Sequence, residues 1–151
     1  MTQKRLLFLQ AITSFSFGAS LLCLIVLFSY LFPNFHSFYG TTSYGPWIEE
    51  GLKFGTVLLL IRLVYLKPIM IPFIGIGFGL MEGISHFINR GIVSIIPFWV
   101  HIILGLVMAF FFYLAVNPKY SSLRSVWYSF ALLIPVYLHL LYNITVASWL
   151  N

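Results

Sequence analysis

Charge is scarce in this sequence: only 7% of its 151 residues are charged, and only three of them are acidic. An ordinary soluble domain carries about 25% charged residues. Because 61% of the residues are apolar, the chain cannot cover a surface that faces water. We therefore predict an all-α protein embedded in a lipid bilayer. The net charge of +5 does not indicate nucleic-acid binding, since basic residues at the ends of apolar runs orient membrane helices instead.

Cysteine is nearly absent as well. Cys23 is the single one and lies inside an apolar run, which excludes a disulfide within the chain and a cysteine-rich metal site. A signal peptide is not indicated either, because the first apolar stretch, 6–32, is much longer than the roughly 7–15 residues of a signal-peptide core. We expect this stretch to remain as the first membrane span.

What the chain has in place of charge is long apolar runs. A membrane-spanning helix needs about 20 apolar residues. Breaks that contain proline, asparagine or glycine separate the runs, and these residues favour turns. We predict one compact bundle, a single transmembrane domain over residues 1–151, with five spans at about 6–32, 47–66, 68–89, 94–116 and 124–149.

The basic residues predict the orientation of this bundle. If the N-terminus is cytoplasmic, six basic residues lie on or near the inner side and only Arg90 falls in an outer loop. Cytoplasmic loops carry an excess of lysine and arginine. We therefore predict a cytoplasmic N-terminus, an extracytoplasmic C-terminus and a multi-pass location in the cell membrane, with a bacterial cytoplasmic membrane as the natural host.

Most of the remaining polar groups lie inside predicted spans, where an ionised group at mid-bilayer costs about 2.5–3.5 kcal/mol. When the spans alternate in direction, the helical rise brings the polar groups of four spans to one depth in the outer half of the membrane. Scattered packing residues would not converge in this way. The candidate catalytic residues are Glu49, Glu50, Glu82, His101, His139 and Asn143.

Three supporting residues follow from a spacing of four, which puts side chains on one helix face. Lys53 lies four residues after Glu49 and can form an ion pair with it. His86 lies four residues after Glu82 and is expected in a supporting role nearer the surface. Gly105 lies four residues after His101 and allows another helix to approach closely.

Small residues and prolines predict how the spans pack. Gly75, Gly79 and Gly83 form a stripe along the third span, which is typical of a helix-packing face. Pro97 and Pro135 lie in the fourth and fifth spans and predict kinks there.

Structural roles are open for the same polar groups. Glu49 and Glu50 can mark the start of a helix, because acidic side chains are favourable there. Glu82 can be a packing residue, although a glutamate in mid-span indicates function first. His139 and Asn143 can form a hydrogen-bonded pair between helices.

The candidate groups form four short motifs in order along the chain. They match Glu-Glu-x-x-Lys at Glu49 to Lys53, Phe-x-x-x-Glu at Phe78 to Glu82, His-x-x-x-Gly at His101 to Gly105, and His-x-x-x-Asn at His139 to Asn143. Together, over residues 47–143, the set resembles the PrsW-type intramembrane proteases. These proteases are related to the CAAX prenyl endopeptidases and to the Abi proteins linked to bacteriocin self-immunity.

The resemblance implies an intramembrane endopeptidase that hydrolyses membrane-anchored protein substrates near the extracytoplasmic side. Glu49 or Glu50 would activate water, and Glu49 corresponds better to the family's position. His139 and Asn143 would stabilise the oxyanion as hydrogen-bond donors. Glu82 and His101 would orient the water or transfer the proton. Family members usually carry more than five spans, so a second copy of this chain could supply further helices in an oligomer.

The same groups could instead hold Zn²⁺. Two histidines and one glutamate with an open fourth position form a common hydrolytic zinc site, which here would be Glu82, His101 and His139. The chain lacks the His-Glu-x-x-His helix of many zinc proteases. The family that it resembles has been described both as metalloproteases and as glutamate-dependent proteases. Both mechanisms stay open, and the sequence favours the metal-free one slightly.

Other functions compete with proteolysis. A non-catalytic relative could act as an immunity or scaffold protein. A proton-coupled transporter would also carry intramembrane glutamate and histidine, but the inner half of these spans has no polar path. A haem carrier could use His101 and His139 as axial ligands, which leaves the three glutamates unexplained.

Overall fold

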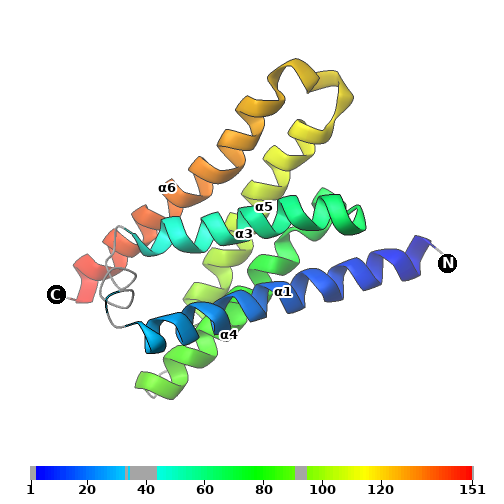
Figure 1. Ribbon diagram of the computed structural model, residues 1–151. Coiled ribbons are helices and arrows are strands. Elements are labelled where there is room, and N and C mark those ends of the chain that lie inside the picture. The colour runs from blue at the N-terminus through cyan, green and yellow to red at the C-terminus, as the bar shows by residue number, and fades with distance from the viewer. Residues whose placement is uncertain (1–2, 33, 35–43, 91–94, 151) are drawn as a thin grey trace.

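The computed structural model describes residues 3–32, 34, 44–90 and 95–150 of the chain (Figure 1). The described residues contain no strand. Their five helices are α1 (Gln3–Leu31), α3 (Gly45–Val64), α4 (Pro72–Arg90), α5 (Ile96–Val116) and α6 (Arg124–Leu150). Two short 3-10 turns, η1 (Pro68–Met70) and η2 (Pro118–Leu123), precede α4 and α6. The prediction of an all-α chain with five helices is confirmed.

Four stretches of this bundle are long and apolar enough to cross a membrane. They are Gln3–Leu31, Pro68–Ile88, Ile96–Val116 and Pro118–Val146. The predicted spans match them within a few residues, and the predicted start of the fourth span at residue 94 lies outside the described residues. The other predicted span, 47–66, corresponds to α3.

Helix α3 is long enough to cross but is interrupted by charge. Its 20 residues extend about 30 Å, the thickness of a hydrocarbon core. It carries Glu49, Glu50, Lys53 and Arg62, so composition does not qualify it as a span. Its crossing of the membrane stays a prediction.

The helices alternate in direction, and the two chain ends lie at opposite ends of the bundle (Figure 1). Helix α3 runs back along α1: Nε2 of Gln10, near the start of α1, donates to the carbonyl oxygens of Val64 at 3.3 Å and Tyr65 at 3.1 Å. Tyr65 ends α3 in the left-handed conformation, with φ of 51°. These bonds fix the depth of α3 relative to α1.

Glycine lets α4 lie between α1 and α5. A Cβ at Gly77 would overlap the backbone of Phe15 in α1, and a Cβ at Gly75 would overlap the carbonyl of His101 in α5. A Cβ at Gly79 would lie 2.9 Å from Cα of Phe98. The predicted packing role of Gly75 and Gly79 is confirmed.

The two predicted proline kinks have different outcomes. Pro97 lies in the first two residues of α5, where a helix needs no N–H donor, so the predicted kink at this residue is wrong. Pro135 lies inside α6 and removes one backbone hydrogen bond from it. This proline is one turn before His139.

Candidate functional site

The charged residues near the start of α3 point into the bundle. Glu49, Glu50 and Lys53 are 6%, 0% and 4% exposed. They share this buried face with Val57 and Leu60, whereas residues between them along the helix are more exposed. The helix therefore turns its two glutamates and Lys53 inward, together with Val57 and Leu60. This arrangement suits a helix that is surrounded by lipid.

Lys53 connects α3 to α5. Its Nζ donates to Oε1 of Glu50 at 2.7 Å and lies 2.8 Å from Nδ1 of His101. The ion pair is thus formed with Glu50, three residues earlier. The spacing had predicted a pair with Glu49, four residues earlier, whereas the pair that the structure shows is with Glu50.

Hydrogen-bond chemistry fixes the protons on both imidazole rings. The amine of Lys53 is a donor, so Nδ1 of His101 accepts and Nε2 carries the proton. That Nε2 donates to Oε2 of Glu82 at 2.7 Å. Nδ1 of His139 lies 3.1 Å from Oε1 of Glu50, and because a carboxylate only accepts, Nδ1 is the donor. In the neutral ring, Nε2 of His139 then carries the lone pair and can accept.

Three groups from three helices converge beside these bonds. Oε2 of Glu49 lies 3.7 Å from Nε2 of His101 and 3.9 Å from Nε2 of His139. The two rings stand nearly perpendicular, at 81°, with centroids 5.0 Å apart. Glu49 and His139 both present acceptors to this point. Two acceptors at such a distance do not bond each other, but one water can donate to both.

The donor set also fits a metal ion. Single ligand atoms of Glu49, Glu50, His101 and His139 all lie within 4.8 Å of one another. Oxygen and nitrogen ligands at about 2.0–2.2 Å from zinc stand roughly 3.3–3.6 Å apart in a tetrahedron. The separations around Glu49 are close to that. The amine of Lys53, which bonds both Glu50 and His101, competes with a cation for this set.

This group of four possible metal ligands differs from the ligands expected from the sequence, because it contains Glu49 and Glu50 in place of Glu82. Glu82 touches the cluster through His101, and its side chain is 23% exposed. His86 lies at the end of this line: its Nε2 is 3.7 Å from Oε1 of Glu82, and its side chain is 32% exposed.

The last two candidates lie outside the hydrogen-bonded cluster. Asn143 is half-buried, and within the described part of the chain it forms no hydrogen bond. A Cβ at Gly105 would lie 3.0 Å from Cα of Pro72, so the predicted close approach at this glycine is confirmed. The neighbour is the start of α4.

Two residues contribute more than the sequence indicated. The fully buried ring of Phe78 packs edge-on against His101, with centroids 4.8 Å apart, and lies 4.0 Å from Nζ of Lys53. It seals the cluster from the core, and its only signal in the sequence was its place in a motif. Gly75 brings α4 against the backbone of His101, which sets the position of that ring.

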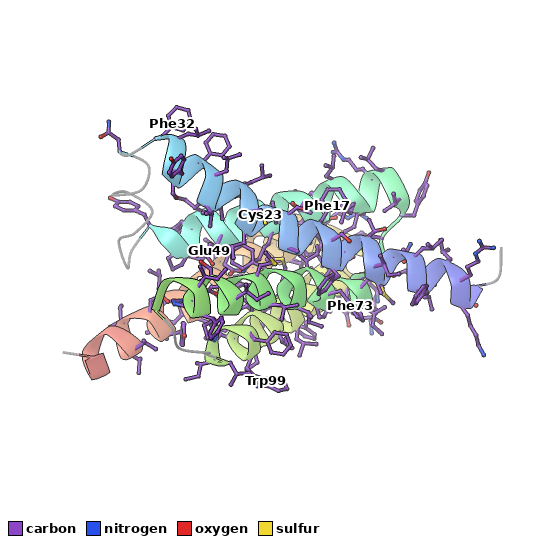
Figure 2. All side chains as sticks on the ribbon, turned by 90° about the horizontal axis from the view of Figure 1, so that it is seen from below. Phe17, Cys23, Phe32, Glu49, Phe73 and Trp99 are labelled. Atoms are coloured by element: carbon purple, nitrogen blue, oxygen red, sulfur yellow. The ribbon has the colours of Figure 1, made fainter. Side chains whose placement is uncertain are left out.

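The cluster lies toward one end of the bundle. Figure 2 shows Glu49 in the same half of the molecule as Phe32, the residue that follows the end of α1. Residues of α3, α4, α5 and α6 therefore meet at one level, as the alternating directions of the helices predicted.

Comparison with models of known protein families finds no match to this chain, and comparisons with curated proteins and with solved structures find none either.

Proposed function

We propose that this chain is an intramembrane endopeptidase that hydrolyses membrane-anchored proteins near the extracytoplasmic face of the membrane, with α3 as a fifth span. One observation carries the proposal: four helices bring two carboxylates, two imidazoles and one amine into a single hydrogen-bonded cluster. A third carboxylate, that of Glu49, lies beside it, with Oε2 3.7 Å from Nε2 of His101. Such a set is costly inside a bilayer, and polar residues at this depth mark functional sites. The four motifs that these residues belong to support a protease in particular.

The geometry favours Glu49 over Glu50 as the general base. Glu50 is bonded to Lys53 and His139 through the same oxygen, which makes it a fixed counter-charge. Glu49 faces the point where Nε2 of His139 also accepts. A water that donates to both is oriented with its lone pairs directed away from the two acceptors, toward an incoming peptide carbonyl.

The reaction then balances within the cluster. Glu49 takes a proton from water as the oxygen bonds to the carbonyl carbon, and the carbonyl oxygen becomes an oxyanion. The amide of Asn143, one turn from His139, would donate to that oxyanion. The oxyanion then re-forms the carbonyl as the C–N bond breaks, and Glu49 passes the proton that it took from water to the leaving amine. His101, bonded to Lys53 and Glu82, holds the charges of the cluster in place.

A zinc-assisted form of the same reaction is the second candidate. Glu49 and the Nε2 atoms of His101 and His139 would hold the ion, which would polarise the attacking water. This form requires His101 to release the proton that it donates to Glu82. For that reason we favour the metal-free form.

Cleavage of single-span reporter proteins in liposomes tests the proposal. Glu49→Gln should lower the rate by about 10²–10⁴-fold, the usual contribution of a general base. Leu52→Ala is the matched control, because this side chain lies in the next turn of the same helix but is 41% exposed, and it should cleave at the wild-type rate. Equal rates for wild type and Glu49→Gln would disprove the assignment.

A zinc chelator added to wild type separates the two mechanisms. Unchanged cleavage indicates the metal-free form. Cleavage that is lost with chelator and restored by zinc indicates that Glu49, His101 and His139 hold the ion.

A further inference from the structure

The cluster has one edge that is more open than the rest. His101 and Glu50 have side chains that are 1% exposed, and Lys53 is 5% exposed. The exposed fraction then rises along the bonded line to 23% at Glu82 and 32% at His86. Exposure increases in the direction of the last turn of α4, which ends at Arg90.

Apolar grooves flank this edge on both sides. Between α4 and α5 lies a groove of about 350 Å³ that is lined by residues such as Leu80, Ile84 and Phe87. Between α4 and α1 lies another of about 500 Å³, lined by Met81 and Ile88 among others. Glu82 and His86 therefore form a narrow polar strip between two surfaces that suit lipid chains.

The strip also leads to the reacting point. Oε2 of Glu82 and Oε2 of Glu49 both lie next to the same atom, Nε2 of His101, at 2.7 Å and 3.7 Å. The side toward the core is closed, because Phe78 covers Lys53 and His101 there. Hydrolysis consumes a water in each turnover, so a site within a bilayer needs a supply of it.

We propose that the strip formed by Glu82 and His86 is the port through which water from the extracytoplasmic phase reaches Glu49. The two side chains, one helical turn apart, hydrate the port, and His86 forms its outer rim. The inference takes the outward direction and the need for water from the proposed protease function. The port itself is measured by accessibility and not by cleavage.

Thiol labelling tests the port in sealed vesicles of known orientation. His86→Cys is made in a Cys23→Ala background and treated with a charged, membrane-impermeant methanethiosulfonate. Ile84→Cys is the matched control, because it lies at nearly the same depth and is 42% exposed, but faces an apolar groove. Added from the extracytoplasmic side, the reagent should modify the cysteine at position 86 on the order of a hundredfold faster, since charge is excluded from hydrocarbon.

Equal, slow labelling at positions 84 and 86 overturns the port, provided that both thiols react after unfolding in detergent. Labelling of position 86 only from the cytoplasmic side also overturns it. If His86→Cys does not fold, hydroxyl-radical footprinting of the unsubstituted chain replaces it. His86 should then be oxidised while its neighbour Phe87, which is 52% exposed but lines a groove, is not. Equal protection of both residues contradicts the port.

The two proposals fail separately. A labelled port in a protein that cleaves no reporter leaves the port standing and counts against the protease. Cleavage without labelling at position 86 means that water reaches Glu49 by another route.

Discussion

Lys53 is the buried cation of the cluster. It bonds Glu50 and His101 and lies over the ring of Phe78, so a single amine touches three of the helices that carry the cluster's groups or wall. A buried charge that loses its partner is strongly unfavourable, more so than a pair that is removed as a whole.

Replacing Lys53 with methionine should therefore destabilise the protein more than removing both charges. We expect Lys53→Met to lower the free energy of unfolding by about 3–5 kcal/mol, because it leaves Glu50 charged and without its cation. The double variant Lys53→Met with Glu50→Gln should recover much of the loss. Thermal unfolding in detergent, arranged as a double-mutant cycle, measures both. Additive losses would show that the ion pair contributes no coupling.

At the scale of a helix, the position of His101 depends on how closely α4 meets α5. A Cβ at Gly75 has no room beside the carbonyl of His101, whereas a Cβ at Gly51 meets nothing within 4 Å. The same substitution at these two positions therefore separates contact between helices from helix propensity.

Gly75→Ala should destabilise the bundle by about 1–3 kcal/mol, because overpacking forces the backbones apart, and it should reduce cleavage by displacing His101. Gly51→Ala should be neutral or stabilise α3 by up to about 1 kcal/mol through helix propensity. Unfolding and cleavage assays on the pair provide the comparison. Full activity of Gly75→Ala would mean that α4 and α5 can separate without moving the ring.

Much of the helical architecture could be predicted from the sequence, because apolar length and proline or glycine breaks define membrane helices almost directly. The common depth of Glu82, His101 and His139 could also be predicted, because successive spans alternate in direction. The partner of Lys53 did not follow, because residues three and four positions earlier lie almost equally close on a helix. Only the placement of His101 and His139 by other helices decides between Glu49 and Glu50.

The packing of Phe78 against the cluster could not be predicted from the sequence either. In a chain with 16 phenylalanines, nothing in spacing distinguishes a ring that packs on the cluster from one that faces lipid. The metal-ligand set changed for a related reason: Glu82 lies at the right depth but on the outer side of His101, and depth alone does not give the angle around the bundle.

For the whole molecule, the side on which the C-terminus lies distinguishes five crossings from four. With a cytoplasmic N-terminus, a crossing α3 puts the C-terminus outside, whereas an α3 that stays within one leaflet puts it inside. Alkaline phosphatase fused after residue 151 should be active, since it folds only outside the cytoplasm, and green fluorescent protein at the same place should not fluoresce. The opposite result would remove α3 from the set of spans.

Every acidic residue of the chain lies in the cluster, which has a consequence for the rest of the surface. Six basic side chains are exposed, at Lys4, Arg5, Arg62, Lys67, Lys119 and Arg124, and the protein offers them no carboxylate. In a membrane, lipid phosphates would be the counter-ions within reach, each worth about 1 kcal/mol at an anionic surface. We therefore expect anionic lipid to stabilise this protein relative to an uncharged detergent, in which these residues repel one another.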